Sequence, residues 1–128
     1  MRKEIVADKG APPKGPYSPA IVAEGPLVFV SGQGPIDPET GELQLGTFQE
    51  QARLAFQNVA TLLEAAGTSW AHAVRVGVFL ANLSDFSAMN EIYQQFLTPP
   101  YPARTTVQVT LPPGMLIEVD CIAAIPER

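Results

Sequence analysis

Two β-rich runs near the end of the chain, joined by a Leu-Pro-Pro-Gly turn at 111–114, constrain the fold more than any other stretch. Each run carries one charged residue, Arg104 in the first and Glu118 in the second, among residues that otherwise suit a buried sheet. A guanidinium or a carboxylate is costly to bury unless it is paired or used in a site. These two residues are therefore the first candidates for functional groups.

Each of the two runs has one polar and one apolar face when it is read with a period of two. Arg104, Thr106 and Gln108 share one side of the first run. Glu118 shares a side with Asp120 in the second run. One interpretation turns these polar faces to water, with Asp120 as a charge at a sheet edge, and the other makes them a site. Whether Arg104 and Glu118 meet depends on the register of a hairpin, which the pattern leaves open.

A functional site would use the two charged side chains differently. The planar guanidinium of Arg104 matches a carboxylate or phosphate through two parallel hydrogen bonds. Glu118 would act as an acid or base. Apolar neighbours would raise the pKa of its carboxyl, and a nearby guanidinium would lower it. Both directions stay open at the level of sequence.

The rest of the chain alternates strands with helices. Strands are expected at residues 3–7, 20–24, 27–31, 73–80, 103–110 and 116–124. Gly25-Pro26 lies between the second and third of these runs and predicts a hairpin turn. The run 27–30 is apolar on both faces, which is typical of a central strand.

Two helices are expected between these strands. Thr47-Phe48-Gln49-Glu50 has the form of a capping box, so the first helix begins there, and Gly67 is a natural stop. Apolar or small residues form one stripe along it, at positions 48, 52, 55, 59, 62 and 66. Ser84 or Asp85 can cap the second helix, whose apolar positions are 86, 89, 93 and 96.

This order of elements favours an α+β fold with a single mixed β-sheet and two helices packed on one face. A chain of 128 residues suffices for one core, so we expect a single domain over residues 1–128. The second face of the sheet then needs a cover. Further copies of the chain in a closed symmetric ring are the simplest one.

Composition narrows the classes of function. A formal charge of −5, with basic residues scattered along the chain, argues against a nucleic-acid or anionic-membrane surface. The single cysteine, Cys121, excludes an intrachain disulfide and is interpreted as a small buried hydrophobe. No apolar run has the length of a membrane span and no secretory signal is visible, so we expect a cytoplasmic protein.

Metal and cofactor motifs are also missing from the sequence. The one histidine, His72, cannot build a zinc site of several imidazoles, and we expect it on the surface of a connection. No cysteine pair, HExxH, P-loop or GxGxxG occurs. We therefore expect no metal and no cofactor.

Five short motifs, spread along the chain, carry a resemblance. They are GPYSPA at 15–20, VSGQ at 30–33, MNEIY at 89–93, PARTTV at 102–107 and IEV at 117–119. In this order they are similar to the RidA/YjgF family of enamine/imine deaminases, over nearly the whole chain. The resemblance implies a chorismate-mutase-like α+β fold and a homotrimer with sites in the clefts between subunits.

The resemblance also implies an activity, the hydrolysis of reactive 2-imino acids to 2-oxo acids and ammonia without a cofactor. The substrates would be 2-iminobutanoate and 2-iminopropanoate, the tautomer of 2-aminoacrylate. Arg104 would hold the substrate carboxylate, and Glu118 would position or activate water. The other matching substrate-binding positions are Tyr17, Ser31, Asn90, Thr105 and Thr106, the last two through their backbone.

Plain alternatives stand beside these assignments. Tyr17 could serve only to pack its ring beside the Pro-rich loop, and Ser31 only to end a strand. Thr106 stands where the family often has cysteine, which puts activity in doubt if a thiol is essential. The alternative function is a non-catalytic trimer that binds small carboxylate metabolites or a partner protein in its clefts. Nuclease activity is disfavoured by the acidic charge and the lack of metal ligands.

Overall fold

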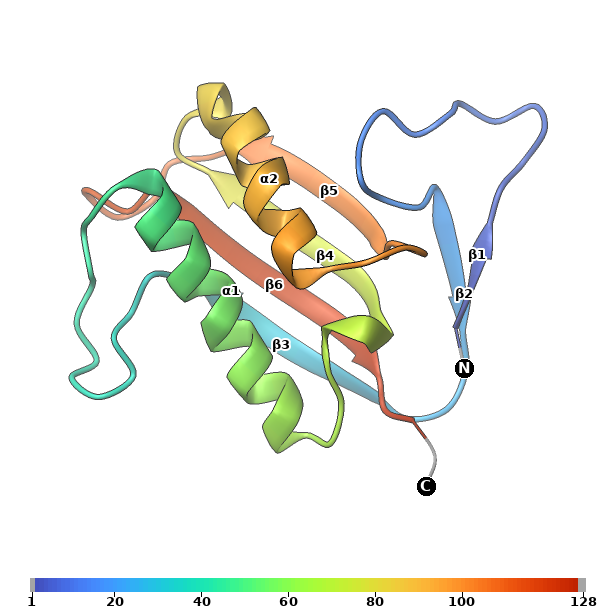
Figure 1. Cartoon of the computed structure of the whole chain (residues 1–128), viewed down its shortest axis with the longest axis horizontal. Helices are drawn as coiled ribbons and strands as arrows, with labels where there is room; N and C mark the ends of the chain where they lie inside the picture. Colours follow the sequence, from blue (N-terminus) through green and yellow to red (C-terminus); the bar gives the residue numbers. More distant parts are fainter. Residues whose placement is uncertain (1, 127–128) are drawn as a thin grey trace.

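The computed structural model describes residues 2–126 and has a four-stranded mixed sheet as its main layer. The strands, in spatial order, are β3 (Leu27–Gln33), β6 (Ile117–Ala124), β4 (Ala73–Leu80) and β5 (Ala103–Gln108). Two helices, α1 (Phe48–Ala65) and α2 (Phe86–Phe96), lie on the same face of this sheet (Figure 1). The expected α+β class is confirmed, and the expected strands and helices are present with boundaries shifted by a few residues.

The expectation of a single sheet is wrong. The first two strands, β1 (Arg2–Ile5) and β2 (Ala20–Ala23), form a separate antiparallel ribbon that stands beyond β5 in Figure 1. The expected hairpin at Gly25-Pro26 is also wrong, because β2 pairs with β1 whereas β3 pairs with β6. Gly25 does turn the chain, with φ of 91°, but it leads from one sheet into the other.

The last two strands are not a hairpin either. β4 lies between them and pairs in parallel with β5 and antiparallel with β6. Parallel neighbours need a crossover connection, and α2 provides it between β4 and β5. The turn at 111–114 therefore leads the chain past β4 to the other side of that strand.

The core lies between the sheet and the two helices. Alternate residues of the central strands, such as Val76 on β4 and Val119 on β6, are fully buried there. The first part of the expected α1 stripe is buried as well. Its end is not, because Leu62 is 43% exposed and Leu63 takes its place in the core. A step of four residues after Val59 keeps the stripe on the sheet, and a step of three does not.

The opposite side of the four-stranded sheet, here called the open face, is covered by neither helix (Figure 1). Phe29 on β3 and Val107 on β5 point to it and are 71% and 39% exposed. β3 is an edge strand, so the expectation of a central position for 27–30 is wrong. In the sequence, an apolar residue on an uncovered face looks the same as one inside a central strand. Within residues 2–126, no helix has the length and hydropathy to cross a membrane.

The capping box at the start of α1 is confirmed and gives a first testable prediction. The Thr47 hydroxyl accepts a hydrogen bond from the Glu50 amide at 3.1 Å, and the Glu50 carboxylate accepts one from the Thr47 amide at 3.0 Å. Thr47→Ala is expected to lower the free energy of unfolding by about 1 kcal/mol in urea denaturation. Thr61→Ala is the matched control, because Thr61 is exposed within the same helix and, in the described part of the chain, its hydroxyl bonds only to the Gln57 carbonyl. Alanine favours the helix interior, so Thr61→Ala is expected to cost little. Equal losses of unfolding free energy in both variants would contradict the role of the cap.

Candidate functional site

Arg104 projects from β5 toward α2. It pairs with Val76 of β4, whose side chain is buried against the helices, so Arg104 lies on the same face. Its Nη1 donates to Asn90 Oδ1 at 2.7 Å. Its Cζ lies 5.6 Å from the ring centroid of Phe86 and 4.8 Å from that of Tyr93. Positions 86, 90 and 93 are separated by four and three residues, so they form one stripe of α2 that faces the guanidinium.

The Pro-rich loop between β1 and β2 contributes Tyr17 to the same place. The Arg104 Cζ lies 5.3 Å from the centroid of the Tyr17 ring. The loop is fastened beside β5 by the Ser18 amide, which donates to the Pro102 carbonyl at 3.0 Å. Gly15 also comes close, since a methyl group there would lie 3.4 Å from Arg104 Nη2. Tyr17, Phe86, Asn90, Tyr93 and Arg104 are together called the arginine cluster.

The guanidinium of this cluster is half-buried and has neutral neighbours. In the described part of the chain its partners are one amide oxygen and three aromatic rings. Burial lowers the pKa of Arg104, and the Tyr93 and Tyr17 hydroxyls oppose that effect. A partly desolvated cation with neutral neighbours is well suited to a bound anion, which would offset the cost of its burial.

Glu118 lies on the other side of the sheet. It pairs with Phe79 of β4, and its neighbours Ile117 and Val119 are the ones buried against the helices. Its carboxylate occupies the space over Gly32 of β3, where a methyl group would overlap it. Ser31 is exposed next to Gly32, in the segment where the register of β3 and β6 shifts. Ser31, Gly32 and Glu118 are called the carboxylate cluster.

Asp120 resembles Glu118 in position but differs in its partner. It also faces the open side and lies over a glycine, Gly77, where a methyl group would overlap its carboxylate. Its Oδ1 accepts a hydrogen bond from the Gly77 amide at 2.8 Å. The carboxylate of Asp120 is therefore engaged with the backbone of its own sheet.

The two clusters do not meet within one chain. Arg104 and Glu118 are on opposite faces of the sheet, and β4 separates their strands. Of the candidate residues, Tyr17, Asn90 and Arg104 come together, whereas Glu118 lies over Gly32, which follows Ser31 in the chain. The chain thus carries two separate groups of candidate residues on opposite faces of its sheet.

Thr105 and Thr106 follow Arg104 and alternate between the two faces. Thr105 is exposed on the open face, where its hydroxyl accepts from Arg75 Nη2 at 3.0 Å. The Thr106 hydroxyl is buried on the helix side and has no hydrogen-bond partner among residues 2–126, and the same is true of the Tyr93 hydroxyl. Both unpartnered hydroxyls belong to residues on the helix side of the sheet, as does Arg104.

Sequence reasoning missed Phe86 and Tyr93 as members of the arginine cluster, because both fit the apolar stripe of a helix. The signal that could have found them was their spacing from Asn90, a polar residue on the same stripe. Cys121 is buried as expected, and burial raises the pKa of its thiol to about 12. Among the described residues, no three His, Cys, Asp or Glu side chains gather where they could hold a metal ion.

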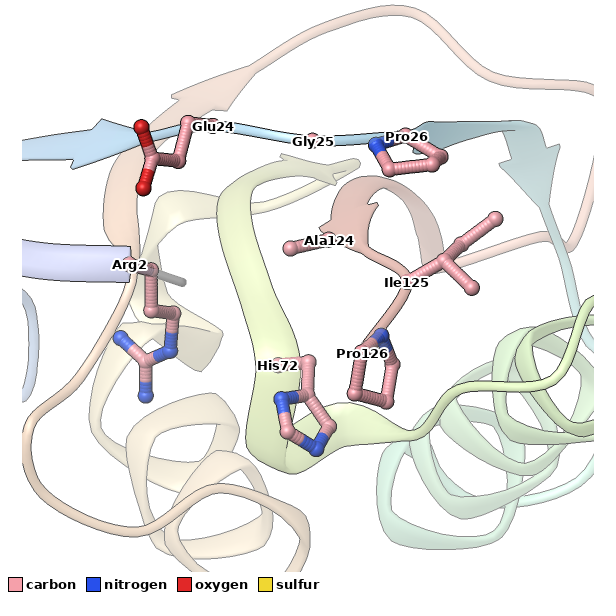
Figure 2. A pocket seen from close by; sticks show the side chains of 8 residues that line it. All are labelled: Arg2, Glu24, Gly25, Pro26, His72, Ala124, Ile125 and Pro126. Atoms are coloured by element: carbon pink, nitrogen blue, oxygen red, sulfur yellow. The ribbon is translucent and has the colours of Figure 1, made fainter. Parts of the chain in front are cut away.

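A pocket of about 610 Å³ lies near the ends of β2 and β6, and no residue of either cluster lines it (Figure 2). Its wall includes Arg2, Glu24 and His72, which is partly buried. Arg2 donates to the Ala71 and Pro100 carbonyls at 3.2 and 2.6 Å. The guanidinium of Arg2 therefore links the β1–β2 ribbon to the segments that lead into β4 and β5.

Comparison with known proteins agrees with the sequence motifs. Residues 8–125 match the family model described as Endoribonuclease L-PSP. A RutC family protein of Pyrococcus abyssi is 46% identical over 125 residues, covering 96% of this chain and 98% of the relative. The human 2-iminobutanoate/2-iminopropanoate deaminase is 37% identical over 124 residues, covering 96% and 90%. The crystal structure of RidA from an Antarctic Psychrobacter species superposes with a TM-score of 0.74 at 44% identity, covering 96% and 99%.

Proposed function

The chain belongs to the Endoribonuclease L-PSP family, which is the RidA/YjgF family, and from this premise we propose that it is a 2-iminobutanoate/2-iminopropanoate deaminase. The reaction would convert a 2-imino acid and water into a 2-oxo acid and ammonia. The observation that carries the proposal is the half-buried Arg104 guanidinium, which has neutral partners and can receive a carboxylate.

The proposed site combines the arginine cluster of one copy with the carboxylate cluster of the next. Two features support it. Arg104 and Glu118 lie on opposite faces of one sheet. The open face, which carries Glu118, also exposes Phe29, a large apolar side chain that a neighbouring copy would cover. A closed ring, here a homotrimer, brings unlike surfaces of successive copies together and so completes each site.

Arg104 would bind the substrate carboxylate and so fix the imine carbon in place. Glu118 would take a proton from a water molecule as the water oxygen bonds to that carbon. The imine nitrogen would take that proton back from Glu118, which gives a carbinolamine. The C–N bond would then break as the hydroxyl proton passes to the same nitrogen, so ammonia leaves with both hydrogens of the water and the carbon keeps the oxygen as the oxo group. An imine is already electrophilic, so positioning and proton transfer are the main demands on the protein.

A non-catalytic role in binding small carboxylate metabolites would need the arginine cluster alone. Gly32 leaves space for the Glu118 carboxylate. In the proposed site this carboxylate would repel an anionic ligand bound to Arg104, so its presence is a disadvantage for binding alone and favours the enzyme. The description of the family as endoribonucleases raises RNA cleavage as a second activity. The net charge of −5 makes attraction of a polyanion unfavourable.

The decisive experiment generates 2-iminobutanoate in situ from threonine with a dehydratase and follows the formation of 2-oxobutanoate. Added protein is expected to accelerate it. The unsupplemented reaction gives the background rate, and a parallel incubation with RNA measures nuclease activity. No acceleration over background would refute the deaminase. Sedimentation of the same sample tests the ring, since a monomer at micromolar concentration would contradict a site shared between copies.

The two glycines under the carboxylates give a further prediction. Gly32→Ala forces the flexible Glu118 side chain aside, so kcat is expected to fall about tenfold to a hundredfold with little change in melting temperature. Gly77→Ala is the matched control, because it displaces Asp120 instead. It is expected to lower stability and leave kcat per folded protein close to wild type. Equal losses of kcat in the two variants, at an unchanged oligomeric state, would contradict the assignment of the catalytic carboxylate to Glu118 and not to Asp120.

A further inference from the structure

We propose that Phe86 and Tyr93 are positioning residues of the site, whose rings hold the Arg104 guanidinium in the orientation that binds the substrate carboxylate. This inference deepens the proposed function and rests on it. It also names the feature of the substrate that the cluster selects, a carboxylate anion.

The geometry around Arg104 carries the inference. A guanidinium has five N–H donors, and within residues 2–126 only Nη1 is engaged, by Asn90. One hydrogen bond leaves the plane of the group free to rotate about that contact. The rings of Tyr17, Phe86 and Tyr93 lie 5.3, 5.6 and 4.8 Å from Cζ, within the range of cation–π attraction. They restrict the rotation and leave the other donors available.

The rings also explain how the charge is tolerated although no carboxylate of residues 2–126 pairs with it. An acidic side chain beside Arg104 would offset its burial but would compete with the substrate for the same donors. Ring faces attract the cation and make no hydrogen bonds with its N–H groups in the plane. They also keep water from one side of the group, which strengthens its attraction for an anion. The arrangement stabilises the cation while leaving its hydrogen-bonding capacity to a ligand.

The two phenylalanines at the ends of α2, Phe86 and Phe96, allow the positioning role to be distinguished from ordinary packing. Both are partly buried against the core. Phe96 stacks on Phe56 at 5.4 Å, whereas Phe86 lies against Arg104. If Phe86 only filled space, replacing either ring would have similar effects on ligand binding. If it positions the guanidinium, only its own replacement weakens the binding of a carboxylate.

The test measures binding of 2-oxobutanoate, and of the neutral 2-oxobutanamide, to Phe86→Leu and to the control Phe96→Leu by calorimetry. Phe86→Leu is expected to weaken binding of the acid roughly threefold to tenfold and that of the amide much less. KM for the imine rises by a similar factor, and kcat changes little. Phe96→Leu is expected to lower the melting temperature and leave both affinities unchanged. Tyr93→Phe keeps the ring and is expected to retain the affinity for the acid.

Equal affinities of wild type and Phe86→Leu for the acid would overturn the inference, as would equal weakening of acid and amide. Phe86→Met, which also lacks a ring but adapts its shape, replaces Phe86→Leu if the latter does not fold. Binding is measured without turnover, so the two proposals fail separately. A wild type that binds 2-oxobutanoate but has no activity refutes the deaminase, and the Phe86 comparison still decides the positioning role.

Discussion

Mixing two variants that are inactive on their own, Arg104→Ala and Glu118→Gln, is expected to restore activity to about a quarter of the wild-type level. Each site would take its guanidinium from one copy and its carboxylate from the next. With random mixing in equal amounts, half of the positions supply an intact Arg104 and half supply an intact Glu118. About a quarter of the sites then receive both groups.

The mixture is prepared by co-expression or by joint refolding, and mass spectrometry of the intact assemblies confirms that hybrids have formed. The control mixes Arg104→Ala with a chain that carries both substitutions. No copy in that mixture provides Arg104, so activity stays at the level of the single variant. Hybrids without recovered activity would show that the two half-sites do not combine across copies.

Glu118→Gln by itself is expected to lose turnover while keeping the ligand. The amide cannot accept the proton of the attacking water, so kcat should fall by a factor of about 10² to 10⁴. The affinity for 2-oxobutanoate, which depends on Arg104, should stay the same or rise slightly because a negative charge is removed. Kinetics with the imine generated in situ measures kcat, and calorimetry with 2-oxobutanoate measures the affinity separately.

Asp120→Asn is the matched control for this change, since Asp120 lies two residues further along the same face of β6. Its remaining side-chain oxygen can still accept the hydrogen bond from Gly77 that Oδ1 receives at 2.8 Å. Turnover close to wild type is therefore expected. Parallel losses of affinity and turnover in Glu118→Gln would mean that Glu118 has a structural role instead.

Local sequence signals predicted where both helices begin, although Asp85 stands at the N-cap of α2 without a side-chain cap hydrogen bond. Thr47 and Glu50 specify the start of α1 by contacts within four residues of each other, and Gly67, with φ of 87°, follows its end. Such contacts depend on neighbours in the chain and need no knowledge of the fold. The motifs also identified Arg104 and Asn90, which are in direct contact, and Tyr17, whose ring lies beside the guanidinium.

Strand order was beyond the reach of the same signals. The Leu-Pro-Pro-Gly turn suits a hairpin, yet β4 separates the strands that it connects. The competing arrangement is decided by the crossover through α2, a contact between distant segments. Phe29 was misplaced for a related reason, because its exposed side resembles the second apolar face of a central strand. The opposite placement of Arg104 and Glu118 follows from the register through β4, in which Arg104 and Cys121 both pair with Val76, and it was likewise invisible in the pattern.

The division of guanidinium and carboxylate between opposite faces of one sheet also determines how an altered allele affects activity beside a normal one. In a closed ring, a copy that lacks only Arg104 or only Glu118 disables one site, the one to which it would give that group. A copy that lacks both groups but still assembles disables two sites and leaves its intact neighbours short of partners. When altered and normal chains are present in equal amounts, an allele of the first kind should leave about half of the sites intact and an allele of the second kind about a quarter, so only the second lowers activity by more than its dose.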